Sequence, residues 1–142
     1  MSDEQSKYCG CLYYTANALA RSLTRMAEEE FSRTGLSPSY AFLLMGVNEK
    51  PGIQPGTLSQ QMQLSPSTIT RLIEKMELKG YLQRKSSGRC TEVYPTQKSL
   101  DLDAQIKSAW QNLYQRYSET LGEKAAIQLT QETFEATQRL NE

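Results

Sequence analysis

Apolar residues at both ends of the chain recur at helical spacing. Over residues 5–33 they follow one another at steps of three and four, and Gly35 is placed to end this segment. A second apolar stripe runs over residues 102–121, stops at Gly122 and resumes over residues 127–140. The pattern predicts one long helix before Gly35 and two further helices separated by Gly122.

Between these long helices the spacing predicts shorter helices with tight polar joints. Ser37 followed by Pro38 combines an N-cap residue with proline at the first helical position. The apolar run that follows ends at a Pro-Gly turn at residues 51–52. A second short helix is expected to begin near Thr57. Its apolar anchors are Leu58, Met62 and Leu64.

A third short helix is predicted from Ser65, where the Ser-Pro start signal is repeated, to a stop at Gly80. Three short helices joined in this way, the last with a polar start, are typical of a helix-turn-helix. The expected buried stripe of the third helix consists of Ile69, Leu72, Ile73, Met76 and Leu78.

The residues after Gly80 alternate between apolar and polar in two short runs, 81–84 and 91–94, separated by a Ser-Ser-Gly-Arg turn. Pro95 is placed to stop the second run. This pattern predicts a two-stranded hairpin that would serve as the wing of a winged helix. The expected fold class is therefore mainly α with a small β-wing, a winged helix-turn-helix flanked by N- and C-terminal helices.

A chain of 142 residues, with 38% hydrophobic and 23% charged residues, is long enough for one domain with a real core. Its first ten residues are polar and acidic, unlike a signal or transit peptide. No run of about 18 apolar residues is present, so a membrane span is not expected. These features predict a cytoplasmic protein.

The formal net charge is zero, but the charge is unevenly distributed. Residues 66–98 contain seven basic and three acidic side chains, a local charge of +4 on an otherwise acidic chain. A basic segment of this kind suits a phosphate-binding face. The alternative is a solvated helix with i,i+4 ion pairs.

The residue types exclude much catalytic chemistry. The chain has no histidine, which rules out Ser-His-Asp and Cys-His arrangements and makes a tetrahedral zinc site dependent on carboxylates or a second chain. Cys9, Cys11 and Cys90 form an odd set, which favours free thiols over a disulfide framework. We therefore expect no enzyme activity, no cofactor and no metal site.

The helix predicted from Ser65 has an unusually polar start. A helix that enters the major groove points its first turns at base edges and phosphates. Ser and Thr bond phosphates or several bases, and Arg can bond guanine O6 and N7 together. The alternative is capping, but one cap needs one hydroxyl, not four. The DNA-contact residues predicted on this helix are Ser65, Ser67, Thr68, Thr70, Arg71 and Lys75.

Two flanking segments supply further candidates for DNA contact. The start of the preceding helix is one, because phosphates bind at helix N-termini; a solvated, capped helix is the alternative. The predicted wing is the other, and an exposed basic strand end is the alternative there. The candidates are Thr57, Ser59 and Gln60 on the helix, and Arg84, Lys85 and Arg89 on the wing.

The order of these elements resembles the MarR family of bacterial transcriptional regulators. So does the run TLSQQMQLSPSTITRLIEKMELKGYLQR at residues 57–84, which is similar to the reader segment of that family. The resemblance covers nearly all of the chain and is strongest over residues 36–96. It implies a single MarR-like domain, 1–142, in which residues 36–96 form the DNA-binding part. Residues 5–34 and 97–140 would then be dimerisation helices.

The resemblance implies a homodimer that binds double-stranded DNA at a palindromic operator, most often as a repressor released by a small-molecule effector. Relatives dimerise through their terminal helices, and an intramolecular helical pair is the alternative here. The candidate interface residues are Leu121, Ile127, Phe134 and Leu140.

The predicted wing departs from the family pattern at one position. In MarR relatives an Asp-x-Arg pair stiffens the wing, and its Arg reaches the minor groove. Ser87-Gly88-Arg89 keeps the Arg but has Ser in place of Asp. We therefore expect a more mobile wing and a less secure role for Arg89 than for Arg71.

In MarR relatives the effector binds where the dimerisation helices meet the reader. Aromatic residues that would line such a pocket are also consistent with plain core. The candidates are Tyr13, Tyr14, Tyr40, Phe42, Trp110 and Tyr114.

Two alternatives to a ligand-released repressor remain open. CGCLY at residues 9–13 is similar to the C-x-x-L-Y start of the peroxide-sensing branch of the family, which makes Cys9 or Cys11 a candidate redox thiol. Against this, the tyrosine that such sensors place before the next helix's proline is Ser37 here. The other alternative is a winged helix that binds a protein partner.

Overall fold

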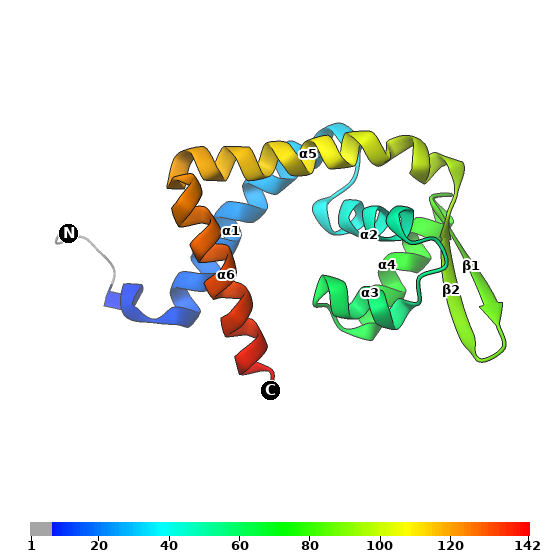
Figure 1. Cartoon of the computed structure of the whole chain (residues 1–142), viewed down its shortest axis with the longest axis horizontal. Coiled ribbons are helices and arrows are strands. Elements are labelled where there is room, and N and C mark those ends of the chain that lie inside the picture. Colours follow the sequence, from blue (N-terminus) through cyan, green and yellow to red (C-terminus); the bar gives the residue numbers. More distant parts are fainter. Residues whose placement is uncertain (1–6) are drawn as a thin grey trace.

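Residues 7–142, the part of the chain that this computed structural model describes, fold into a mostly helical structure with one β-hairpin (Figure 1). None of the described helices is both long and apolar enough to cross a bilayer. In chain order the elements are a 3-10 turn Lys7–Gly10, α1 (Leu12–Phe31), a second 3-10 turn Ser32–Thr34, α2 (Pro38–Glu49), α3 (Pro55–Met62), α4 (Pro66–Leu78), β1 (Leu82–Ser87), β2 (Cys90–Pro95), α5 (Gln97–Leu121) and α6 (Glu123–Leu140).

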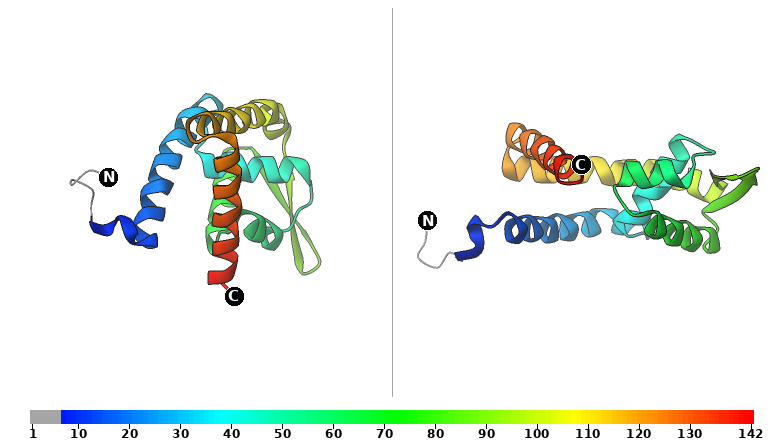
Figure 2. Two further views of the ribbon diagram at one scale, coloured as in Figure 1. Left: turned by 60° about the vertical axis from the view of Figure 1, so that its left-hand side comes forward. Right: turned by 90° about the horizontal axis from the view of Figure 1, so that it is seen from below.

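Helix α5 runs the length of the molecule and joins its two halves (Figure 1). One half, the terminal-helix half, consists of α1 packed along α5 and of α6, which turns back from the end of α5 at Gly122. The other, the reader half, consists of α2, α3, α4 and the hairpin, with α2 packed against α5. Helices α1 and α6 lie apart on the two sides of the α5 end (Figure 2).

The apolar core is centred on α2 in the reader half. This helix is buried along most of its length, and α3, α4, the hairpin and α5 each place apolar side chains around it. In contrast, α6 buries Ala126 alone among its residues. The fully or nearly fully buried core includes Ala41, Leu43, Leu44 and Val47 of α2, Leu58 of α3, Ile69, Ile73 and Met76 of α4, Leu82 and Val93 of the hairpin, and Ile106 of α5.

The helix signals carried by Ser and Gly are confirmed. Ser37 and Ser65 are the N-cap residues of α2 and α4, and the Ser65 hydroxyl accepts the backbone N–H of Thr68 at 3.2 Å. Gly35 and Gly80 have φ angles of 74° and 84°, a region that side chains with a Cβ avoid. Each glycine follows the helix that it was predicted to end.

Two helix starts differ from the sequence predictions. Helix α3 begins at Pro55, two residues before Thr57, because proline is well accommodated in the first helical turn. Helix α1 begins at Leu12, where the preceding 3-10 turn ends. The earlier start predicted at residue 5 lies outside the described residues.

The hairpin strands are longer than predicted. They pair antiparallel until only Gly88 and Arg89 remain as the turn, so Ser87 belongs to the ladder. Gly88 has a φ of 63°, which suits a two-residue hairpin turn. At the other end, Val93 donates its N–H to the carbonyl of Ile53 at 2.9 Å. This bridge ties the base of the wing to the loop between α2 and α3.

Leu78 was predicted to be buried, and this prediction was wrong, because 88% of its surface is exposed. Helical residues advance by about 100° each, so a residue two positions after buried Met76 points to nearly the opposite face. The apolar side chain that continues the core after α4 is Leu82, at the start of the wing.

A polar network fastens α2 to α5. Ser99, fully buried, donates its hydroxyl to the Asn48 amide oxygen at 2.8 Å, and the Asn48 amide nitrogen donates to Asp103 at 3.0 Å. Lys107 forms an ion pair with Asp103 at 2.8 Å. Burial alone raises the pKa of Asp103, but hydrogen bonds from Lys107 and Asn48 outweigh burial and hold that pKa below its usual value.

We predict that Asn48→Ala lowers the free energy of unfolding by about 1–3 kcal/mol, because the buried Ser99 hydroxyl loses its partner. Urea unfolding followed by circular dichroism measures this. The control is Gln97→Ala, which removes an exposed amide bonded to Asp101 and is expected to change stability by about 0.5 kcal/mol or less. Equal losses in both variants would contradict a joining role for the network.

Candidate nucleic-acid interface

Helix α4 presents one face to the core and the other to solvent. Ile69, Ile73 and Met76 are buried, which turns the opposite face outward along the whole helix. Helix α3 leads into α4 through Gln63, whose φ of 55° gives a tight turn between the two helices. The exposed residues of α4 are Pro66, Ser67, Thr70, Arg71, Glu74, Lys75 and Leu78.

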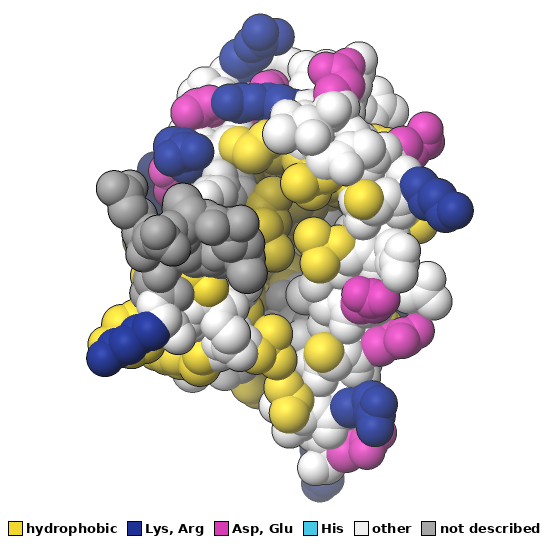
Figure 3. All heavy atoms as spheres, turned by 90° about the vertical axis from the view of Figure 1, so that its left-hand side faces the viewer, with side chains coloured by type: hydrophobic (Ala, Val, Ile, Leu, Met, Phe, Trp, Pro, Cys, Tyr) yellow, Lys and Arg dark blue, Asp and Glu magenta, His cyan; other side chains and the backbone are white. Residues whose placement is uncertain are grey.

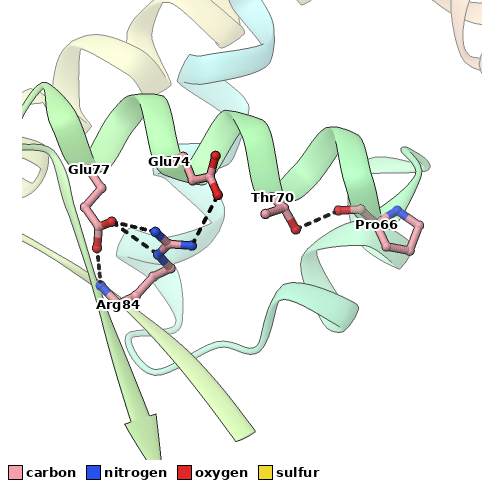
Figure 4. Close-up of polar contacts among 5 residues, drawn as sticks. All are labelled: Pro66, Thr70, Glu74, Glu77 and Arg84. Carbon is pink, nitrogen blue, oxygen red and sulfur yellow. Dashed lines mark hydrogen bonds and ion pairs between the residues drawn. The ribbon is translucent and has the colours of Figure 1, made fainter.

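The hydroxyls at the start of α4 bond one another. The Ser65 Oγ lies 2.8 Å from the Thr68 Oγ1 and 3.2 Å from the Ser67 Oγ. Thr70 donates its hydroxyl back to the Pro66 carbonyl at 3.0 Å (Figure 4). Local hydrogen bonds at the start of α4 therefore involve several hydroxyls, whereas a single N-cap needs one. The Thr70 hydroxyl, which donates to Pro66, keeps its lone pairs as acceptors at the exposed face.

Arg71 lies in the middle of this exposed face. Its Nη2 is 3.5 Å from the Thr68 hydroxyl, a long contact that leaves the guanidinium open to solvent. No ion pair to Arg71 is present among residues 7–142. The sequence prediction placed Arg71 on the outward face of the helix, and the structure agrees.

Arg84, a predicted DNA contact, is bound within the chain instead (Figure 4). Its Nη2 and Nε donate to the Glu77 carboxylate at 2.9 and 3.2 Å, and its backbone N–H donates to the same carboxylate at 3.0 Å. The Arg84 Nη1 also lies 3.8 Å from Glu74. The structure therefore does not support Arg84 as a phosphate contact, because two carboxylates of α4 already neutralise it.

The three hydrogen bonds to Glu77 fix the first wing strand against the end of α4. The side-chain hydrogen bond from Arg84, followed by the backbone one, holds the pKa of Glu77 below its usual value. The positions are seven residues apart across the turn at Gly80, so helical spacing does not pair them. The sequence signal that could have predicted this pair was the turn at Gly80. A chain that reverses direction there brings residues before and after the turn close together.

The other basic residues predicted to contact DNA lie over tyrosine rings or at the hairpin turn. The Lys75 Nζ lies 5.4 Å from the centre of the Tyr40 ring, and the Lys85 Nζ lies 4.8 Å from the centre of the Tyr94 ring. Arg89 is exposed at the wing tip beside Gly88. Together with Arg71, these residues place four cations on the exposed side of α4 and the wing.

The three residues of α3 that were predicted to contact DNA differ in how exposed they are. Gln60 is exposed, Thr57 is half-buried, and the Ser59 hydroxyl donates to the Leu64 carbonyl in the turn before α4. The structure therefore gives Ser59 a role in the turn between the helices and leaves Gln60 as the open side chain of the three.

The end of α4 is also bonded to the start of α5. Lys98 donates to the Lys79 carbonyl at 2.8 Å and lies over the Tyr81 ring at 4.3 Å. The Thr96 hydroxyl donates to the Gly80 carbonyl at 2.6 Å. A cation at the C-terminal end of a helix also offsets the partial negative charge there. These contacts fix the orientation of α4 relative to α5.

Residues 34–89, which include this exposed face, match the family model described as MarR family. The matched segment contains α2, α3, α4 and the first strand of the wing, and over it the chain is similar to the MarR family. The HTH-type transcriptional regulator YybA of Bacillus subtilis (strain 168), itself uncharacterized, is 26% identical over 83 residues, 56% of this chain and 55% of that protein. The chain thus spans about half the length of the curated relative that it matches.

Solved structures share the MarR fold over most of the chain. The transcriptional regulator SlyA is 21% identical with a TM-score of 0.77, covering 92% of this chain and 94% of that one. A putative MarR regulator from Listeria monocytogenes, complexed with 26mer DNA, is 19% identical with a TM-score of 0.75 over 91% and 88%. CouR from Rhodococcus jostii RHA1, bound to p-coumaroyl-CoA, is 18% identical with a TM-score of 0.75 over 93% and 95%.

The aromatic residues that the MarR resemblance suggested for an effector pocket do not form one group. Tyr14 packs against Tyr8 at the N-terminal end and Tyr114 against Tyr117 on α5, while Tyr13 is 80% exposed. Tyr40 lies under Lys75, as described above. Trp110 and Phe42 alone among the candidates line a common cavity, of about 500 Å³, between α2, α3 and α5.

The candidate redox thiols lie at the other end of the molecule from the wing. Cys9 is in the first 3-10 turn and Cys11 is the N-cap residue of α1, and both are exposed. The nearby cation, Lys7, lies over the Tyr8 ring at 5.3 Å. The contacts around these cysteines provide no separate support for a redox role.

We predict that the Glu77–Arg84 pair makes the stability of the protein depend on pH in the acid range. A carboxyl with a lowered folded-state pKa stabilises the fold fully above its ordinary value of 4.5, and that stability is lost as pH falls through the folded-state value. Urea unfolding at about pH 7 and about pH 3 should therefore show a deficit for Glu77→Gln that shrinks in acid. Glu28→Gln on α1 is the matched control, and a deficit independent of pH would contradict the assignment.

Proposed function

We propose that this protein is a sequence-specific regulator of transcription that binds double-stranded DNA as a homodimer at a palindromic operator. The observation that carries the proposal is the outward face of α4, where Ser67, Thr70 and Arg71 are exposed on a helix whose opposite face is buried in the core. The Listeria relative of similar fold, solved with a 26mer DNA, supports the same use of the fold.

In the proposed complex, Arg71 reads a base and the flanking cations bind phosphates. An exposed guanidinium on the middle of a helix in the major groove can bond guanine O6 and N7 together. Lys75 lies one turn after Arg71 on the same helix, while Lys85 and Arg89 extend along the wing toward the adjacent groove. Gln60 and Ser67 would add backbone contacts on the α3 side.

The proposed homodimer rests on the exposed apolar surface of the terminal-helix half. Ile127 and Phe134 of α6 are each 51% exposed. Figure 3 shows apolar side chains gathered around a hollow on this side of the molecule. Helix α6 packs mainly on α5. Leu23 of α1 and Phe134 of α6 line a common hollow of about 340 Å³, so the two helices do not close over this face. The exposed apolar residues here are Leu12, Tyr13, Leu121, Ile127, Leu129, Phe134 and Leu140.

We further propose that the protein is a repressor released by a small molecule. The cavity that holds Phe42 and Trp110 lies between the reader half and α5, so an occupant would contact elements on both sides of that junction. A ligand that binds one arrangement of the two halves better than another shifts the population toward it. CouR, of similar fold, was solved with p-coumaroyl-CoA, which supports ligand binding within this fold.

We predict that Arg71→Ala weakens binding to the protein's own promoter DNA by about 1–3 kcal/mol and relaxes specificity at one base pair of each half-site. Fluorescence anisotropy at fixed salt measures both. Arg25→Ala on α1, also an exposed arginine, is the control and should retain wild-type affinity. Unchanged affinity in Arg71→Ala, with no salt dependence in the wild type, would refute the DNA-binding proposal. If the affinity of Arg71→Ala is unchanged but wild-type binding depends on salt, the protein binds DNA and Arg71 does not contact a base.

A second variant tests the homodimer. Phe134→Glu places a charge on the apolar face of α6 and is expected to convert the dimer to monomer at micromolar concentration, because an unpaired charge is costly to bury in an interface. Sedimentation equilibrium measures the change. Gln128→Glu adds the same charge on the outer side of α6 and should leave the dimer intact. A monomeric wild-type protein would contradict the proposal.

A further inference from the structure

The cavity between α2, α3 and α5 has an unusual charge balance. It is lined mainly by apolar side chains, with Ser39 and Gln61 as its neutral polar groups. Glu49 is the one charged residue among the described residues that line it, and neither Lys nor Arg is among them. A cavity of about 500 Å³ is within the usual range for small-molecule sites.

The negative character of the cavity has a second source in the backbone. Glu49 is the last residue of α2, so its carboxylate lies where the unpaired carbonyls of the helix carry partial negative charge. Two lysines are near Glu49 in the fold or the sequence. Lys107 is held by Asp103 at 2.8 Å, and Lys50 is exposed and does not line the cavity.

Two aromatic rings form a corner on the same cavity. Phe42 and Trp110 meet edge to face, with ring centres 6.0 Å apart and planes at 85°. Trp110 is 47% exposed, which leaves its face open to an occupant. Aromatic faces attract cations, and Trp does so most strongly. The sulfur atoms of Met45 and Met62 complete a polarizable apolar wall.

We propose that this cavity binds a lipophilic aromatic cation, with Glu49 as its counter-ion and Trp110 as its stacking surface. A carboxylate or phosphate ligand would meet Glu49 without any cation on the lining to offset the repulsion. Binding of the cation to the cavity does not require DNA. Only the effect of that binding on transcription rests on the proposed function.

Tetraphenylphosphonium and tetraphenylborate, which share a shape and differ in the sign of their charge, test the proposal on the full chain without DNA. Trp110 is the single tryptophan of the chain, so its fluorescence reports the cavity directly. We expect tetraphenylphosphonium to change that fluorescence and to bind more tightly than tetraphenylborate. Glu49→Gln should weaken tetraphenylphosphonium about three- to fivefold, as loss of a partly exposed ion pair does.

The control variant is Glu28→Gln, which removes an exposed carboxylate on α1 and should leave tetraphenylphosphonium binding unchanged. Equal or tighter binding of tetraphenylborate to the wild type would overturn the proposal, as would equal losses in the two variants. An absence of any Trp110 response to tetraphenylphosphonium would also overturn it. Because no DNA is present, these outcomes are independent of whether the protein binds an operator.

Discussion

The burial of α2 is the constraint on which the rest of the structure depends. This helix is enclosed by α3, α4, the wing and α5, so each of those elements takes its place by packing on α2. The Asn48–Ser99–Asp103 network then joins α2 to α5 by hydrogen bonds that tolerate little sliding. A displacement of α5 is therefore transmitted to the reader half as a whole, because a close-packed core moves as a unit.

The basic residues of segment 66–98 divide into two kinds. Arg84 and Lys98 serve the fold, since one holds the wing to α4 and the other holds the end of α4 to α5. The other five, Arg71, Lys75, Lys79, Lys85 and Arg89, are exposed. The local net charge of +4 counts both kinds of basic residue alike. It therefore does not say how many of these cations lie on the exposed surface. Orientation, set by Glu77 and the core, decides which of these cations lie on the exposed side of α4 and the wing.

Much of the fold was predictable because its signals are local. Ser before Pro starts a helix, a glycine at positive φ ends one, and residues near the signal decide both. Leu78 was misplaced because its apolar character was given more weight than its angular position. The Glu77–Arg84 pair was missed because it spans a chain reversal. The aromatic candidates scattered for a similar reason: sequence identifies the rings, but only tertiary packing determines which of them face one cavity.

The two halves of the molecule differ in how completely they are folded on their own. The reader half has a closed core and a polar outer face, as an independent domain would. The terminal-helix half has helices too exposed and too apolar to remain uncovered in water, with Ala126 the one buried residue of α6. Such a face is stable only when another apolar face covers it. Because α5 belongs to both halves, the second copy that would cover α6 in the proposed homodimer would also set the direction of α5, and hence the spacing between the two copies of α4.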